Sequence, residues 1–171
     1  MANPGITKYG ADVLRKAAEP VEEINDEIIN TINDMLETLY ASKDGVGIAA
    51  PQIGVSKRII IIDTNPSDAS SKPIVLINPE IVEKEGESIA EEGCLSVPDI
   101  RSDVKRCERI IVEGLDHEGN KIRVEGTGLL ARVFQHEIDH INGTLFIDHI
   151  SKLKQQLIKK RLHKIEKGQT K

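Results

Sequence analysis

The chain carries the residue types and spacing of a catalytic metal site at residues 136–140, His-Glu-Ile-Asp-His. On a helix, residues four positions apart lie on one face, so His136 and His140 could bind a single metal ion together. The carboxylate of Glu137 would lie beside that ion, near enough to take a proton from a water molecule that the metal activates. The alternative is a solvated helix whose two histidines share no role. The apolar residues around the motif favour the metal site.

The motif lies in a segment whose apolar residues cover most of a helical circumference, which indicates a buried helix. Thr127 is a candidate cap for its start, and Asn142-Gly143 supplies a left-handed residue to end it. Leu129 and Val133 fall on the histidine side. They are therefore candidates to line a substrate pocket, although ordinary core positions would explain both equally well.

The third protein ligand distinguishes the possible enzyme classes. One class of metalloprotease adds a third histidine, but Phe146 holds its position and His149 comes three residues too late. A second class uses a downstream glutamate, and Glu166, the only one available, lies in a basic tail. Cys94 remains the best donor, because the glycine before it and the proline after it indicate a turn that could aim a thiolate at a metal. Cys107, predicted in a strand, stays open as an alternative.

A run of very small residues, Gly-Val-Gly-Ile-Ala-Ala, occupies residues 45–50. It nominally matches a dinucleotide-binding fingerprint, but that fingerprint leaves a strand and opens a helix, whereas this run follows a predicted helix. No Gly-Lys-Ser/Thr follows, which excludes a Walker-type phosphate loop. We predict a loop that could hold an extended peptide by main-chain hydrogen bonds, with Gln52 as its polar side chain. Gly47 and Ile48 are therefore candidate substrate-binding residues.

Composition indicates a globular protein of one domain. At 171 residues the chain can bury a real core, and with 2% aromatic residues and no Trp that core must be aliphatic. The longest apolar run, residues 59–62, is far short of a membrane span, and the N-terminus lacks an apolar signal region. We therefore expect a cytoplasmic protein with no membrane partner. Two cysteines fit a reducing compartment.

Charge is distributed unevenly along the chain. The net charge is -5, yet residues 151–171 hold eight Lys/Arg and one acidic residue, which leaves 15 basic and 27 acidic residues before them. We expect this tail to form a helix whose apolar stripe docks on the domain, with a basic face outward; the stripe comprises Leu153, Leu157, Leu162 and Ile165. A basic face suggests contact with nucleic acid or another polyanion, and a merely solvated helix is the alternative.

Helices are predicted before and after a middle dominated by strands. The first helix should begin at Asn25-Asp26-Glu27 and end near Asp44-Gly45. The predicted strands are residues 58–63, residues 73–77 and 80–84 joined at Asn78-Pro79, and a hairpin of residues 104–115 and 121–125. This order predicts an α+β fold with mainly antiparallel sheets packed around the buried metal-binding helix, followed by a C-terminal helix. Residues 1–171 would form a single metallohydrolase domain.

Three motifs, taken together, resemble the signature motifs of the peptide deformylase family in order and spacing. They are Gly-Val-Gly-Ile-Ala-Ala-Pro-Gln at residues 45–52, Glu-Gly-Cys-Leu-Ser at residues 92–96 and His-Glu-Ile-Asp-His at residues 136–140. The resemblance covers nearly the whole chain, and the helical tail is similar to the common bacterial form. One departure is Gly10-Ala11-Asp12, where the family usually carries prolines.

The resemblance implies removal of the N-formyl group from the initiator methionine of new peptides. It implies one divalent metal ion, ferrous iron in the cell and zinc or nickel as alternatives in purified protein, held by Cys94, His136 and His140. The general acid/base would be Glu137, and the oxyanion donors would be Gln52 and the backbone N–H of Leu95.

The partners implied are N-formylmethionyl nascent chains and, through the basic C-terminal helix, the ribosome. Two rival functions remain: a metallopeptidase that cleaves unformylated peptides, and a non-catalytic, metal-stabilised module that binds RNA or the ribosome.

Overall fold

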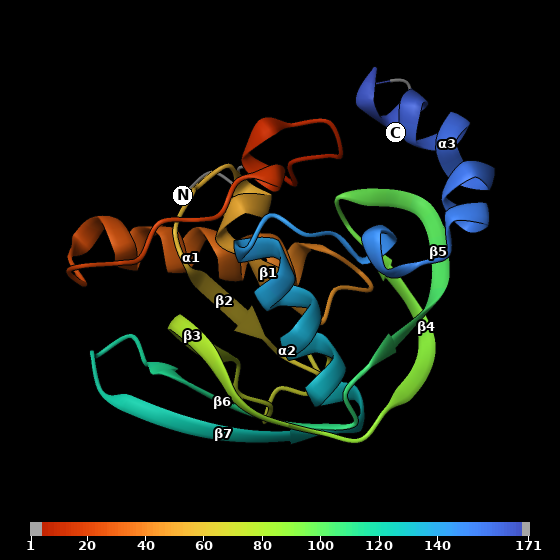
Figure 1. The fold of residues 1–171 in the computed structure, drawn as a ribbon. Coiled ribbons are helices and arrows are strands. Elements are labelled where there is room, and N and C mark those ends of the chain that lie inside the picture. The colour runs from red at the N-terminus through yellow and green to blue at the C-terminus, as the bar shows by residue number, and fades with distance from the viewer. Residues whose placement is uncertain (1–4, 169–171) are drawn as a thin grey trace.

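A helix, α2 (Gly128–Ile141), lies against one face of an antiparallel sheet in the computed structural model, which describes residues 5–168 (Figure 1). The sheet has five strands in the order β1-β2-β3-β6-β7. Their bounds are β1 (Gly47–Ala49), β2 (Ile59–Ile62), β3 (Ile74–Glu85), β6 (Arg109–Leu115) and β7 (Lys121–Thr127). A separate two-stranded hairpin consists of β4 (Ser88–Cys94) and β5 (Val97–Arg106).

Three short 3-10 helices and two further α-helices complete the fold. They are η1 (Asp12–Arg15), η2 (Ala50–Ile53), η3 (Phe146–His149), α1 (Asp26–Ala41) and α3 (Lys152–Glu166). This arrangement confirms the predicted α+β fold with mainly antiparallel sheets and a C-terminal helix. No helix of the described part of the chain is both long enough and apolar enough to cross a membrane.

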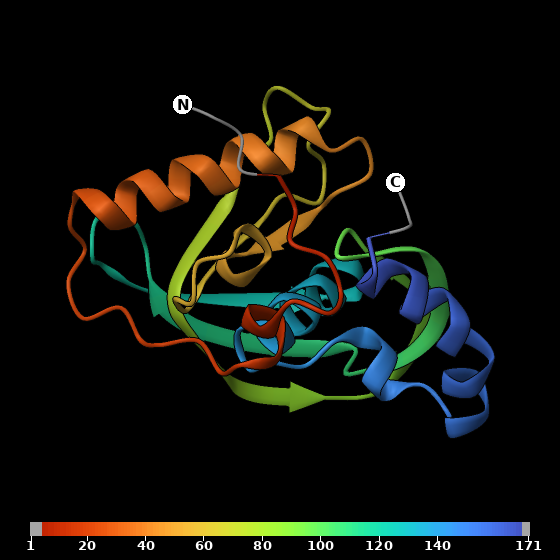
Figure 2. The same ribbon diagram turned by 90° about the horizontal axis from the view of Figure 1, so that it is seen from above.

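The four isoleucines of β2 show how the sheet is buried on both faces. Side chains alternate along a strand, so Ile60 and Ile62 join the core under α2 while Ile59 and Ile61 join the core under α1. Figure 2 shows α1 and α2 on opposite sides of this strand layer. The core is almost wholly aliphatic, as the composition predicts.

Helix α1 begins as predicted, because the side chain of Asn25 accepts a hydrogen bond from the Ile28 N–H at 3.1 Å. It ends at Ala41, before the predicted end near Asp44-Gly45, since the Ser42 hydroxyl and N–H both bond to the Leu39 carbonyl.

Helix α2 also ends as predicted, with Asn142 as C-cap and Gly143 at φ +80°. Thr127 occupies the N-cap position, but its side chain makes no capping hydrogen bond.

Two strand predictions were wrong in detail, and one predicted turn is shorter than expected. Residues 74–85 form one strand, because Asn78 takes a left-handed conformation within a register shift instead of ending the strand. The predicted strand 104–115 breaks at Cys107, which lies in the connection between β5 and β6. The turn predicted around Cys94 is only Leu95-Ser96, since Cys94 ends β4.

The run of small residues predicted as a loop contains strand β1, paired with β2 at the edge of the sheet. Gly and Ala carry little strand signal, so pairing with the neighbouring isoleucines, rather than local propensity, determines its conformation.

Helix α3 packs beside the β4–β5 hairpin (Figure 2). Ile158 and Ile165 are buried there with Leu162 partly covered, whereas Leu153 and Leu157 are 68% and 70% exposed. The predicted docking stripe was therefore wrong in its first half, because the helix meets the hairpin only along the line through its later residues. Residues 169–171 of the predicted tail lie outside the described residues.

Gly10 lies where the backbone conformation and a close contact both require glycine. Its φ is +105°, and a Cβ built on it would lie 2.7 Å from Cγ of Glu166, at the end of α3. Proline fixes φ near -65°, so it cannot adopt this conformation. Glycine lets the end of α3 approach the N-terminal segment closely.

Candidate active site

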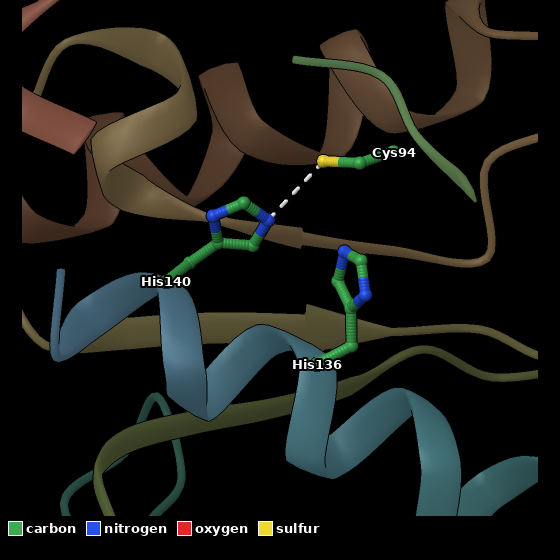
Figure 3. A group of neighbouring side chains, drawn as sticks. All are labelled: Cys94, His136 and His140. Carbon is green, nitrogen blue, oxygen red and sulfur yellow. Dashed lines mark hydrogen bonds between the residues drawn. The ribbon is translucent and has the colours of Figure 1, made fainter. Parts of the chain in front are cut away.

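Three side chains that could bind a metal meet between α2 and the hairpin. Cys94 comes from the end of β4, while His136 and His140 come from successive turns of α2 (Figure 3). Their candidate ligand atoms all lie within 4.8 Å of one another, and Cys94 Sγ is 3.3 Å from His140 Nε2. Among residues 5–168, this is the only such cluster of His, Cys, Asp or Glu.

Cys107, the alternative thiol, lies away from this cluster. Its backbone N–H and C=O are bonded by the side chain of Gln135 at 2.9 Å each, and its side chain packs against the core under α2. The structure therefore brings Cys94, and not Cys107, to the histidines.

The donor set fits a divalent transition metal. The Nδ1 atom of His136 lies 2.9 Å from Oε1 of Glu92, and a carboxylate only accepts, so Nδ1 carries the hydrogen. This leaves Nε2 with a lone pair for a ligand. Two buried polar atoms lack a hydrogen-bond partner in the described part of the chain, Glu137 Oε1 and His140 Nδ1. Both lie at this site, as expected where a bound group or water supplies the missing partner.

Gln52 lies next to the cluster and is 2% exposed. Its Oε1 accepts a hydrogen bond from the Ala49 N–H at 3.0 Å, which turns Nε2 toward Cys94 Sγ at 3.6 Å and Ser96 Oγ at 3.1 Å. An amide fixed in this way presents donors to the site without further reorganisation.

A cavity of about 520 Å³ opens onto the cluster. The sequence-predicted residues that line it are Gly47, Gln52, Cys94, Leu95, Leu129, Val133 and His136. Ile48 does not line the cavity, because its side chain is fully buried in the core under α1. The side chain of Ile48 is therefore not available to a ligand, and this substrate-binding prediction was wrong.

The polypeptide deformylase family model matches residues 4–156. The chain belongs to this family. It is 52% identical over 161 residues to a peptide deformylase of Thermodesulfovibrio yellowstonii, with 94% of this chain and 97% of the relative aligned.

Two crystal structures of peptide deformylases are similar to the whole fold. The one from Legionella pneumophila has a TM-score of 0.88 at 45% identity and covers 96% of this chain and 95% of its own. The one from Thermus thermophilus has a TM-score of 0.88 at 41% identity, and the match covers 99% of this chain and 100% of the Thermus chain. As a member of the peptide deformylase family, the protein is an enzyme, a hydrolase of protein biosynthesis that acts on new chains.

Charges around the deformylase site stabilise the thiolate form of Cys94. Burial alone would raise the pKa of this thiol, but the positive charge of His140 and hydrogen bonds from both histidines outweigh burial and hold the pKa well below its ordinary value. Burial would lower the pKa of His136, yet its hydrogen bonds to Cys94 and Glu92 raise it. A divalent cation at this site would displace the proton that a raised pKa favours on His136.

Burial raises the pKa of Glu137, because a desolvated carboxylate is less stable when ionised. A carboxyl group with a raised pKa can both accept and return a proton near neutral pH. A Cβ at Gly47 would lie 2.7 Å from Oε2 of Glu137 and 2.8 Å from Cγ1 of Val133. Only glycine at position 47 leaves room for the carboxylate where it stands.

The buried charges behind the candidate metal ligands were not predicted from the sequence. Glu92 pairs through both oxygens with Arg106 at 2.9 Å and 2.9 Å, and Arg132 donates to it at 2.6 Å. Burial would raise the pKa of Glu92, but the hydrogen bond from Arg106 leads the effects that hold it well below its usual range. A signal was present: Glu92 opens the Glu-Gly-Cys-Leu-Ser motif, two residues before the candidate ligand Cys94.

Proposed function

We propose that the enzyme removes the formyl group from N-formylmethionyl peptides with one divalent metal ion bound by Cys94, His136 and His140. The observation that carries this proposal is the convergence of one thiol and two imidazoles beside the buried carboxylate of Glu137. Two His and one thiolate leave an open position, which is typical of catalytic sites. A soft sulfur ligand suits iron, zinc or nickel, and we propose ferrous iron in the cell.

The residues around the metal have distinct roles in this proposal. When bound, the metal would supply Lewis acidity and lower the pKa of a water molecule toward neutrality. Glu137 takes the proton of the attacking water and later gives it to the leaving amine, as its raised pKa allows. Gln52 Nε2 and the backbone N–H of Leu95 donate to the developing oxyanion.

Strand β1 provides an open edge for the peptide backbone. The Asp63 N–H donates to the Val46 carbonyl at 2.8 Å, so residue 46 forms a hydrogen-bonded pair with residue 63. Pairs of this type alternate in an antiparallel ladder, so the N–H and C=O of Gly47 point away from β2. A peptide can add there as a further strand, with its methionine side chain against Leu129 and Val133.

The test is a pair of peptide assays on metal-loaded protein. We expect formate release from formyl-Met-Ala-Ser and no cleavage of Met-Ala-Ser. Cleavage of the unformylated peptide would favour the metallopeptidase, and metal binding without any turnover would favour the binding module.

We also propose that α3 contacts the ribosome. Basic side chains face outward along this helix, and the two exposed leucines, Leu153 and Leu157, add an apolar contact. Basic residues would meet the phosphates of ribosomal RNA, and such binding falls steeply as salt rises. Because the proposed substrate is a new chain, we further propose a cytoplasmic location. We also propose that residues 1–171 form a single functional domain.

Reversing Lys159, Lys160 and Arg161 to Glu should abolish ribosome co-sedimentation while leaving activity on formyl-Met-Ala-Ser intact. All three are exposed on α3 and none lines the cavity; Arg161 donates to the carbonyl of Asp99, at the cavity rim, at 3.3 Å. Their reversal removes three attractive charges and adds three repulsive ones, and electrostatic binding to RNA responds to each.

The control reverses three exposed lysines elsewhere, Lys43, Lys72 and Lys121, to Glu. It makes the same change in net charge and should retain most of the ribosome binding. Equal loss in both variants, or unchanged and salt-insensitive binding by the α3 variant, would show that α3 is only a solvated helix.

A further inference from the structure

Arg132 is a buried arginine that no proposed catalytic step uses. It lies on α2 one turn before His136, and its side chain is 9% exposed. Its guanidinium donates to Glu92 Oε2 at 2.6 Å, to the Val104 carbonyl at 2.8 Å and to the Ser88 carbonyl at 2.9 Å. One side chain of α2 thus bonds to both strands of the β4–β5 hairpin.

These bonds matter because the candidate metal ligands come from two separate elements. Helix α2, which carries His136 and His140, packs against the five-stranded sheet. The hairpin that carries Cys94 belongs to another sheet. The relative position of these two bodies determines the distance between the thiol and the imidazoles, so bridges between them affect the whole donor set.

Arg132 differs from the other bridges between α2 and the hairpin strands in what it binds. Gln135 also holds main-chain groups, but only those of Cys107, one residue beyond β5. His136 reaches the hairpin through the Glu92 side chain, and Asp139 reaches it through the Arg106 side chain at 2.6 Å. Side chains can adjust when a strand shifts. Arg132 instead bonds to main-chain carbonyls at Ser88 and Val104, so it fixes the strands themselves.

Arg132 also bonds to Glu92, a side chain that contacts the candidate ligand His136. Glu92, two positions before Cys94, accepts from His136 on Oε1 and from Arg132 on Oε2. Arg106 alone would satisfy the charge of Glu92 from within the hairpin. The second guanidinium, coming from α2, acts together with His136 to place this carboxylate relative to the helix.

We propose that Arg132 is a positioning residue of the metal centre, which holds the Cys94-bearing hairpin at the distance from α2 that lets all three ligands reach one ion. The inference rests on the metal centre of the proposed function. Loss of this guanidinium leaves the folded hairpin freer to move against α2. The donor set is then less preorganised, and metal affinity falls.

The test measures cobalt binding to Arg132→Met, which keeps the apolar stem and removes the guanidinium. Co²⁺ bound by a thiolate gives a charge-transfer absorption band, and chelator competition gives its affinity. We expect affinity to fall by about 10-fold or more, as for residues that orient metal ligands elsewhere, together with a weaker or shifted thiolate band. Circular dichroism below the melting temperature should show a folded protein.

The matched control is Arg109→Met. Arg109 also pairs with several carboxylates, at 3.0 Å to Glu125 and 3.2 Å to Glu85, but it joins strands of the five-stranded sheet. Its replacement should leave cobalt affinity and the thiolate band unchanged, even if the melting temperature falls.

A folded Arg132→Met protein with wild-type cobalt affinity and spectrum would overturn the inference and make Arg132 a brace of the fold alone. If this variant does not fold, Arg132→Lys decides the question, because it keeps a cation for Glu92 but cannot hold both main-chain carbonyls. We expect weakened cobalt binding there, and wild-type binding would overturn the inference. A wild-type protein without any thiolate band would instead refute the proposed metal centre itself.

Discussion

Glu137→Gln should retain its metal and lose its turnover. The amide keeps the size of the carboxylate but cannot accept a proton, and general-base catalysis of this kind contributes at least about 10²-fold to kcat. Glu137 is not one of the clustered ligands, so metal content should be unchanged. The measurement is formate release from formyl-Met-Ala-Ser, with metal analysis of the same sample.

An exposed carboxylate away from the cavity provides the control for this substitution. Glu22→Gln makes the same chemical change on the surface and should keep full activity. Near-normal turnover by metal-loaded Glu137→Gln would refute the assigned role of Glu137, although the family membership would stand.

Cys94→Ser should lose most of its metal affinity. A neutral hydroxyl replaces an anionic sulfur whose low pKa shows that the site already stabilises the thiolate. We expect metal affinity to drop by at least about 10-fold. Replacing a residue that only orients a metal ligand already costs about that much, and Cys94 would be a ligand itself. Metal content after dialysis, and chelator competition, measure this loss.

Cys107→Ser is the matched control, since it makes the same change at the other thiol. Its side chain packs against the core instead of pointing at the histidines, so metal affinity should be unchanged. If Cys107→Ser lost the metal and Cys94→Ser kept it, the ligand assignment would be wrong while the deformylase fold and family would remain.

The helical part of the site could be predicted from the sequence because one local rule places it. Residues four apart share a helix face, so the spacing of His136 and His140 alone brought two candidate ligands together. Cys94 lies on a separate hairpin, 42 positions before His136, and no local rule connects the two. Elimination and the family resemblance made it the best donor, and the fold brings it to the histidines.

The buried charges were beyond sequence reasoning for a different reason. Arginine usually lies at the protein surface, so the sequence does not indicate that Arg106 and Arg132 are buried. Only the fold shows that both surround Glu92. The predicted strand ends were wrong where pairing between strands overrides local sequence signals. Asn78, for example, continues β3 through a register shift. In α3, periodicity showed several apolar residues but not that Leu153 would stay exposed.

Metal titration of formate release tests whether turnover requires one bound metal ion. Protein stripped by a chelator is titrated anaerobically with Fe²⁺, and formate release from formyl-Met-Ala-Ser is followed at each addition. We predict almost no activity without metal and a plateau at about one equivalent, as expected for a single site with three protein ligands. Full activity of the stripped protein would refute the metal requirement, and no formate release at any metal level would refute the proposed reaction.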